Sequence, residues 1–506
     1  MKKLYTFLLA AALLSLGSCE KDLDQNPLSN GSVPDFYQTA TDFDQALTAV
    51  YSQLRGYPDR LLVLSEIRSD NIYGVSSQGV RDWDPINNFN STLAINPYVS
   101  DTWAQDYNAI YRANLFLDQL NERGGAVLNE TLRKRYEAEA RFLRAFHYFD
   151  LVRTFGAVPL IERAVGPEEV AKIGRAPVAQ VYELIIADLT FATTNLATTY
   201  TGANVGRAST GAAKGLLALV YLTRSGPTYN IAGPGLATND YAAAITLLDD
   251  IINARGTARY ALITATGSAP SAYGNVFSYA NENNAEVLFD VQYIVGNGAT
   301  HPGLLVPPGY FTSLGIPFDS RGIEIKPVST DLLTSYAAND PRKAFAIQTG
   351  YTTTNPAFTE NRSLFKKYIS AAGRGTGGTD WPINFITMRY ADVLLLKAEA
   401  LLRSGGSAGD AAALVNQVRA RAGLSALTSI TLPQLMEERR REFAAEGLRW
   451  HDLVRTGLVL TVMNDWIARE NPGGKIQQVV PNYIIYPVPQ SELSATPGLY
   501  AQNPGY

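Results

Sequence analysis

Residues 393–423 read VLLLKAEALLRSGGSAGDAAALVNQVRARAG, and this stretch decides the fold class of the chain. Across 388–403, apolar side chains recur at three- and four-residue spacing, which is typical of an amphipathic helix with one face to bury. A glycine-rich turn follows, and a second helix is predicted over 410–421. The unit spans 31 residues, close to the roughly 34 residues of a tetratricopeptide repeat. The sequence therefore predicts a helical hairpin at this position.

The same periodicity occurs along much of the chain. It predicts helices over 106–120, 132–153, 209–224, 240–254, 388–403, 410–421 and 434–447. The stretch 211–226 leads into 241–256 as a second pair of the same kind, and both pairs carry alanine where helices would cross. Small residues at crossing points let neighbouring pairs stack into an array. We therefore expect a mainly α fold built from tetratricopeptide-like helix-turn-helix repeats.

Two segments interrupt this pattern. Residues 71–103 are rich in Asn, Ser, Gly and aromatic residues without a helical period, and residues 257–386 carry short β-like runs such as EVLFDVQYIV at 286–295. Long irregular segments inside a compact protein are usually functional or disordered, and their aromatic content argues against disorder. We expect a helical region at 35–256 that contains an aromatic loop at 71–103, an irregular region with the ligand site at 257–386, and a C-terminal helical region at 387–506.

The N-terminus resembles a bacterial lipoprotein signal. Lys2 and Lys3 precede 13 residues of apolar character, and Gly17 and Ser18 then lead to Cys19. Such an apolar stretch is too short to span a bilayer, which needs about 20 residues, and the layout is that of a secretory signal. The lipobox resemblance implies that residues 1–18 are removed, that Cys19 carries lipid, and that 19–34 is a tether. The alternative is an ordinary signal with an incidental thiol.

Charge and cysteine content exclude several classes of protein. Without Lys2 and Lys3 the chain has 41 basic against 47 acidic residues, so it lacks the basic footprint of a nucleic-acid-binding protein. Cys19 is its single cysteine, which leaves no disulfide framework.

Side chains suited to sugar binding gather in the irregular segments. Sugar sites combine flat aromatic rings with amide, carboxylate and guanidinium groups. The N-terminal segment supplies Asp70, Asn71, Tyr73, Arg81, Trp83, Asn87 and Asn88, and the irregular region supplies Tyr279, Tyr310 and Trp381. We expect Trp83 to be exposed because it lies in an acidic, proline-containing loop, and Tyr310 because it follows the loop VPPG. Trp103 and Tyr293 are expected in the core.

Four stretches, taken together and in this order, resemble the SusD/RagB family of surface nutrient-binding lipoproteins. They are LRAFHYFDLVRTFGAVPL (143–160), MRYADVLLLKAEAL with NQVRARAGL (388–401 and 416–424), ERRREFAAEGLRWHDLVRTG (438–457) and YPVPQSELSATPGLYAQNPGY (486–506). The resemblance implies a SusD-like helical fold with four tetratricopeptide-like repeats and a more irregular half that holds the ligand site. It also implies an oligosaccharide, glycan or peptide ligand and a SusC-like TonB-dependent transporter as partner. The acidic Glu20, Asp22 and Asp24 resemble the family's surface-export signal, which implies an outer-membrane location facing the exterior.

Two other functions stay open from the residues alone. A glycan-cleaving enzyme would need catalytic groups, but His147, His301 and His451 are scattered and no HExxH or GxSxG motif is present. A pair of carboxylates at any sequence distance could still support glycoside hydrolysis. The repeats could alternatively serve as a scaffold for protein contacts only. We expect structural roles for His147 and His451 and no metal or cofactor. For the charge run 438–442 we expect a solvated helix face, with Met436 and Phe443 facing inward; the alternatives are a structural salt-bridge network or a contact with the transporter.

Overall fold

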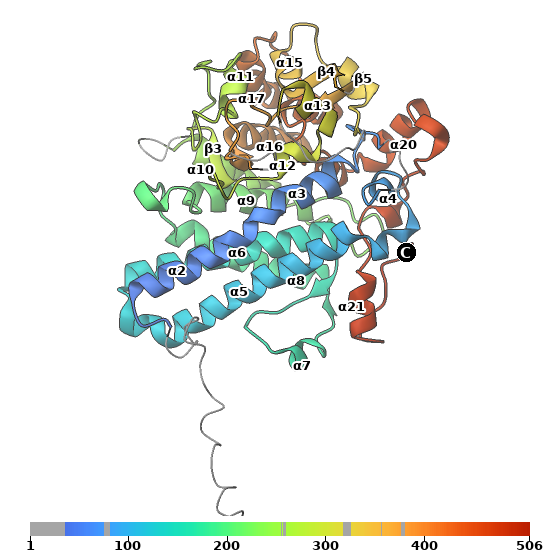
Figure 1. Cartoon of the computed structure of the whole chain (residues 1–506). Helices are drawn as coiled ribbons and strands as arrows, with labels where there is room; N and C mark the ends of the chain where they lie inside the picture. Colours follow the sequence, from blue (N-terminus) through green and yellow to red (C-terminus); the bar gives the residue numbers. More distant parts are fainter. Residues whose placement is uncertain are drawn as a thin grey trace, which may run out of the picture.

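The computed structural model describes residues 36–506, except 75–80, 255, 257–259, 317–324, 356 and 376–379. The predicted signal peptide 1–18, the lipid attachment at Cys19 and the tether 19–34 lie outside the described residues. Figure 1 shows the long helices of the N-terminal half side by side in the lower part of the molecule, and above them short helices, strands and connecting segments together with helices of the C-terminal part.

The long helices form a stack in which each helix packs against the next. The irregular region lies between α10 (Tyr241–Ile252) and α16 (Tyr390–Arg403) in the sequence. These two helices nevertheless pack directly on each other, so the stack is continuous. In order, the stack contains α5 (Pro97–Val127), α6 (Glu130–Phe155), α8 (Val178–Asn195), α9 (Thr210–Arg224), α10 (Tyr241–Ile252), α16 (Tyr390–Arg403) and α17 (Ala408–Arg421). The predicted mainly α fold is confirmed.

Local residue chemistry sets where these helices begin and end. Asn129 caps α6, since its side chain accepts a hydrogen bond from the Leu132 amide at 2.9 Å, and Gly156 ends the helix at a φ of 74°. Ser407 caps α17 in the same way, two residues after Gly405, which adopts a φ of 78° in the turn from α16. Side-chain caps satisfy amides that helix ends leave unpaired, and glycine accepts positive φ without strain. The hairpin predicted over 393–423 is thus present.

Shorter elements complete the fold around the stack. The other helices are α2 (Ala40–Tyr51), α3 (Tyr57–Leu61), α4 (Asp84–Asn87), α7 (Pro167–Val170), α11 (Ala272–Val276), α12 (His301–Leu304), α13 (Pro308–Ser313), α14 (Thr330–Ser335), α15 (Pro341–Ala346), α18 (Leu432–Glu442), α19 (Arg449–Thr456), α20 (Val459–Arg469) and α21 (Gln490–Ala495). Three antiparallel strand pairs join β1 (Val158–Pro159) to β2 (Arg175–Ala176), β3 (Val287–Val291) to β6 (Phe385–Arg389), and β4 (Ile347–Thr354) to β5 (Ala357–Phe365).

Two of the expected boundaries are wrong. Residues 71–103 are not a continuous loop, because they contain α4, a 3₁₀ turn at Ser91–Ile95 and the first turns of α5. The first two elements are too short to show a helical period, and α5 begins at Pro97, before the expected start of its helix at 106. The helix expected over 434–447 ends at Glu442, and Ala445 and Gly447 then adopt φ values of 63° and 75°. Left-handed backbone at these positions cannot continue a right-handed helix. Trp103 and Tyr293 are buried, as expected.

The sequence predicts a solvated face for the charge run 438–442, but the structure places most of this run inside the protein. Glu438, Arg439, Arg440 and Glu442 are all buried. The Glu442 carboxylate accepts from Arg389 at 2.6 Å and from Arg342 at 3.0 Å, and it also pairs with Arg421. The sequence could not reveal this burial, because the partner charges come from segments far away along the chain.

The neighbouring charges extend this buried network in both directions. Arg439 binds Asp392 of α16 at 2.6 Å and Asp452 of α19 at 2.8 Å. Arg449 holds both oxygens of Asp70 at 2.8 Å. Burial alone would raise the pKa of Asp70, but Arg440 and Arg449 hold it at about 2. The network therefore joins α16, α18 and α19 to the segment that precedes α4.

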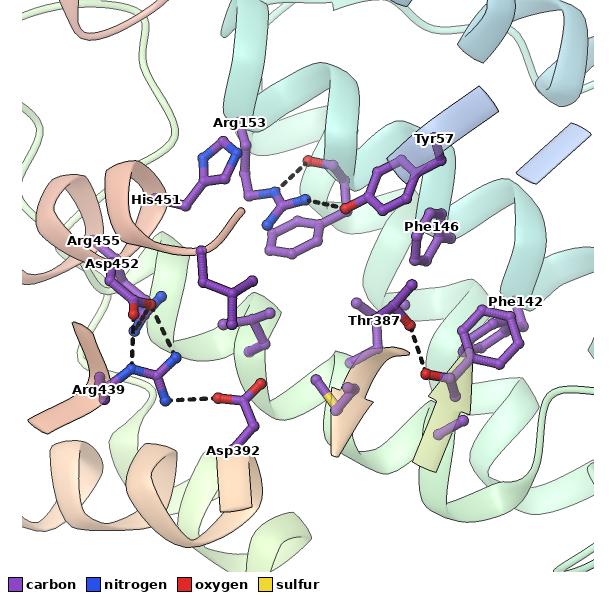
Figure 2. A pocket seen from close by; sticks show the side chains of 17 residues that line it. Tyr57, Phe142, Phe146, Arg153, Thr387, Asp392, Arg439, His451, Asp452 and Arg455 are labelled. Carbon is purple, nitrogen blue, oxygen red and sulfur yellow. Dashed lines mark hydrogen bonds and ion pairs between the residues drawn. The ribbon is translucent and has the colours of Figure 1, made fainter. Parts of the chain in front are cut away.

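An internal cavity of about 40 Å³ lies beside the network. In Figure 2, Arg439, Asp392, Asp452 and Arg455 line one side of it, and the rings of Phe142 and Phe146 from α6 line the other. His451 also borders this cavity, and burial lowers its pKa well below the usual range. A neutral imidazole between helices fits the structural role expected for His451.

Replacing Glu442 with glutamine tests the importance of the network. The change leaves the buried guanidinium groups of Arg342, Arg389 and Arg421 without their shared anion, so we expect the free energy of unfolding to fall by about 3–5 kcal/mol. Urea denaturation followed by circular dichroism measures this loss. Glu169→Gln is the control, because its pair with Arg163 is exposed and such pairs contribute about 0–1 kcal/mol. Equal, small losses in both variants would show that the network contributes little to stability.

Asp106 and Asp150 lie in a second cluster of buried charged groups, and both carboxyls have a raised pKa. Burial, together with the adjacent Asp106 carboxylate, raises the pKa of Asp150 to about 7, and burial raises the pKa of Asp106 to about 6. Arg60 lies 3.1 Å from Asp106, and Arg153 lies 3.2 Å from Asp150. His147 contacts Asp106 at 2.9 Å, and burial lowers the pKa of this histidine to about 3. His147 is therefore a neutral core residue.

The two raised carboxyl pKa values predict how stability changes with pH. Because the folded chain holds these protons more tightly than the unfolded chain, their contribution is full below about pH 4 and is lost as the pH rises through about 7. Asp150→Asn cannot ionise, so its free energy of unfolding should depend less on pH in this window, by about 1.4 kcal/mol for each unit of pKa difference. Urea denaturation across the window measures the slope. Asp101→Asn, at an exposed position, should keep the wild-type slope, and an unchanged slope in Asp150→Asn would refute the assignment.

Candidate functional site: an aromatic face on the irregular region

Three segments that are far apart in the sequence run side by side above the helical stack. Ile72 pairs with Val328 in an antiparallel bridge, and the Tyr73 amide donates to the Pro327 carbonyl at 3.1 Å. The Val328 amide in turn donates to the Ser363 carbonyl of β5 at 2.9 Å. These bonds fix the segment around Tyr73 next to the β4–β5 hairpin.

This arrangement gathers aromatic rings on one face of the protein. We use "aromatic face" for Tyr73, Trp83, Tyr310, Tyr351 and Phe358. The ring centroids of Tyr310 and Tyr351 are 5.8 Å apart, and those of Tyr351 and Phe358 are 6.2 Å apart. Phe358 is 36% exposed, and Tyr73 and Tyr351 are half-buried. The rings of Tyr351 and Phe358 therefore present apolar surface at the outside of the hairpin.

An arginine–carboxylate pair adjoins these rings. Arg362 donates to Glu360 through two bonds of 2.9 and 2.8 Å, and this pairing lowers the pKa of the Glu360 carboxyl. The Arg362 guanidinium also interacts electrostatically with the hydroxyls of Tyr73 and Tyr351. In the hairpin register, Tyr351 is opposite Glu360, and alternate residues of a strand share a face. Flat rings and a charged hydrogen-bonding pair thus lie together, which is the combination that sugar rings require.

Two predicted ring platforms are more buried than expected. Trp83 is 5% exposed and Tyr310 is 7% exposed. Gly74 passes so close to the Trp83 ring that an added Cβ would lie 2.4 Å from it, and the Lys326 ammonium lies 5.1 Å from the ring centroid. The expectation of exposed rings is wrong for both residues, because neighbouring backbone and side chains cover them. Tyr310 packs against Tyr351, and Trp83 packs against the backbone at Gly74.

Three predicted polar ligands instead hold the chain in place. Asp70, Asn71 and Asn87 are each at most 1% exposed. Asn71 donates to Glu66 at 2.8 Å and accepts from Arg440 at 2.7 Å. Asn87 donates to the Ile67 and Ile72 carbonyls and accepts from the Gly74 amide at 2.8 Å. Their hydrogen-bonding capacity is directed inward, so the structure assigns them to positioning the segment that carries Tyr73.

The other predicted residues lie at different places. Arg81 and Asn88 are half-buried on the segment around Trp83, and their contact with a ligand stays a prediction. Trp381, predicted as a ligand contact, is fully buried in the core, with its ring centroid 5.8 Å from that of Phe311. Tyr279 lines a separate cleft between α11 and residues 367–373.

Sequence reasoning missed Tyr351, Phe358 and Arg362. Their signal was weak, because the hairpin sequences IQTGYTTT and AFTENRSLF contain single aromatic residues among polar ones. A large apolar residue on the polar side of a strand was the available clue, but only the strand pairing shows that Tyr351 and Phe358 share a face.

The histidines and acidic groups of the described residues have the following surroundings. His301 lies among the rings of Tyr293, Tyr368 and Phe385. His147 instead lies beside the carboxylate of Asp106. Within the described ranges, no group of three or more His, Cys, Asp or Glu residues has the arrangement needed to hold a metal ion.

Across that same part of the chain, none of the helices combines the length and apolar character that crossing a bilayer would require.

Comparison with known proteins identifies the family. A family model described as "SusD family" matches residues 329–506, and one described as "Starch-binding associating with outer membrane" matches residues 23–222. SusD-like protein P2 of Formosa agariphila is 30% identical over 549 aligned positions that cover 100% of both chains. The chain belongs to the SusD family. This membership confirms the resemblance seen in the sequence.

Other SusD-family proteins show which ligands relatives bind. Starch-binding protein SusD of Bacteroides thetaiotaomicron is 27% identical over 457 positions, covering 78% of this chain and 76% of that protein. A solved structure described as a laminarin-binding SusD-like protein is 27% identical, with a TM-score of 0.73 and coverage of 93% of this chain and 100% of that chain. Starch and laminarin are both glucose polymers, and these names apply to the relatives.

Proposed function

We propose that this chain is a glycan-binding lipoprotein of the outer membrane that captures neutral oligosaccharides on its aromatic face. This proposal rests on the exposed Phe358 ring and the half-buried Tyr351 ring, which lie beside the Arg362–Glu360 pair. The rings offer flat apolar surface to sugar C–H faces, and the guanidinium and carboxylate groups offer directed hydrogen bonds to hydroxyls. The starch- and laminarin-binding relatives support a glucan as the first ligand to test.

The proposed ligand site combines residues from two of the regions predicted from the sequence. Tyr310, Tyr351, Phe358 and Arg362 belong to the irregular region 257–386, and Tyr73 comes from the N-terminal region 35–256. Helices of the N-terminal region and of 387–506 would provide the rigid support. Arg81 and Asn88 would contact a ligand only where it extends toward the Trp83 segment, since their side chains are half-buried there.

The proposal includes a lipid anchor at Cys19 and delivery of the glycan to a SusC-like TonB-dependent transporter. Family membership and the matched description "associating with outer membrane" support this location. The signal-like sequence before Cys19 supports the anchor, because two or more acyl chains hold a protein stably at a membrane. Binding without cleavage would raise the local concentration of substrate next to the transporter.

Removing the outer rings tests glycan capture. Tyr351→Ala combined with Phe358→Ala should weaken binding of a glucan hexasaccharide about tenfold or more, since about 1.4 kcal/mol of lost stacking corresponds to tenfold in affinity. Isothermal calorimetry with laminarihexaose and maltohexaose measures the change. Tyr111→Ala is the matched control, because it removes an exposed ring of α5 outside the aromatic face. Wild-type affinity in the double variant would refute the aromatic face as the site, and release of new reducing ends by the wild type would instead indicate a hydrolase.

Replacing Cys19 with alanine tests the anchor. Without the thiol no diacylglycerol can be attached, so the protein should leave the membrane fraction or accumulate with its signal uncleaved. Cell fractionation and labelling with radioactive palmitate measure both effects, and Ser18→Ala is the control because it leaves the thiol in place. A Cys19→Ala protein that still incorporates palmitate and stays at the cell surface would contradict the anchor.

A further inference from the structure

A second cleft, separate from the aromatic face, lies between α11 and residues 367–373. Its volume is about 490 Å³, within the roughly 300–1,000 Å³ of pockets that bind small molecules. Among its lining residues are Tyr279, Phe345, Ser278 and Ser370, and it shares no lining residue with the aromatic face. Phe345 lies just before the base of the β4–β5 hairpin at Ile347. Tyr351 is four residues further along β4, or about 14 Å at the rise of a strand.

Aromatic rings form the apolar part of the cleft. Phe345 and Tyr279 are half-buried and therefore accessible in part. Phe277 supports Phe345 from behind, with stacked rings whose centroids are 6.0 Å apart. The Tyr279 hydroxyl donates to the Tyr368 carbonyl at 2.9 Å, which fixes the orientation of its ring.

Glycine brings backbone against the Tyr279 ring. An added Cβ at Gly373 would lie 2.6 Å from this ring, so only glycine permits the observed approach. Tyr279 is consequently clamped between its own hydrogen bond and the backbone at Gly373. A ring held in this way loses little conformational freedom when a ligand stacks on it.

The polar groups of the cleft favour a neutral ligand. Among the described residues that line it, none carries a carboxylate. Its one lysine, Lys367, is buried and donates to the Tyr273 hydroxyl, the Ala444 carbonyl and Glu446 at 2.8, 3.0 and 2.5 Å. An ammonium group has three donors, so these bonds use the charge internally. The remaining polar lining includes the hydroxyls of Ser278 and Ser370, each of which accepts one internal amide and keeps further hydrogen-bonding capacity.

We propose that this cleft is a second glycan-binding subsite, which takes a short run of uncharged sugar rings stacked on Tyr279 and Phe345. This inference rests on the proposed function, because it assumes that the protein binds oligosaccharides. The partly exposed rings and the serine hydroxyls suit uncharged sugars, and the lining offers no unpaired charge to an ionic ligand, because Lys367 is already paired with Glu446.

Calorimetry with laminarihexaose and maltohexaose tests the subsite on the intact chain. Wild type should bind two hexasaccharides, and Tyr279→Ala should bind one. Ala372→Arg, at an exposed position that lines the cleft, should also bind one, because it fills the cleft without removing an internal contact. Tyr279→Phe keeps the ring and should bind two. Thermal unfolding of each variant verifies that the fold is intact, and Ala372→Arg provides the result if Tyr279→Ala is unstable.

The outcomes separate this inference from the proposed function. Wild-type stoichiometry and affinity in both Tyr279→Ala and Ala372→Arg would overturn the second subsite and leave the aromatic face standing. Loss of all binding in the cleft variants, with unchanged binding in Tyr351→Ala combined with Phe358→Ala, would establish the cleft and overturn the aromatic face. Absence of binding to any glucan by the wild type would overturn both.

Discussion

A single buried carboxylate, Glu442, constrains how this protein is assembled. Three guanidinium groups, from Arg342, Arg389 and Arg421, converge on it, and each comes from a different part of the chain. A buried charge without its partner is far more costly than a missing apolar contact, so these segments are stable only when all of them are in place. The network thereby determines which segments meet, whereas apolar packing alone would tolerate several arrangements.

The same network reaches the proposed glycan site. Arg440 and Arg449 bind Asp70, and Arg440 also binds Asn71. The next residues of that segment pair with 327–328, which in turn pair with β5. The position of Tyr73 relative to Tyr351 is thus fixed by hydrogen bonds that begin in the protein core. The proposed binding face gains the rigidity of the scaffold in this way.

The sequence predicted the parts of the fold that depend on local pattern. The helices around Leu394 and Leu395 and their turn at Gly405 follow from spacing and backbone preference, and the family stretches located the same elements. The burial of Arg439 and Arg440 could not be predicted, because their partners Asp392, Asp452 and Asp70 are distant in sequence. The candidate site was predicted in part: Tyr73 lies on the aromatic face, but Trp83 and Tyr310 are covered by neighbours, and Tyr351 and Phe358 emerge only from strand pairing.

The direct packing of α10 on α16 gives the irregular region the character of an insertion. The chain leaves the helical stack after α10 and returns to it at α16, so both ends of the inserted region lie close together in space. A segment with adjacent ends can change in length and sequence while the host keeps its own packing. Here that freedom is limited at a few attachment points, since Arg342, Lys367 and Arg389 of the insertion must still meet Glu442 and Glu446 of the host. The part of the proposed glycan surface that this region carries can therefore change as one unit, provided that these charges are kept.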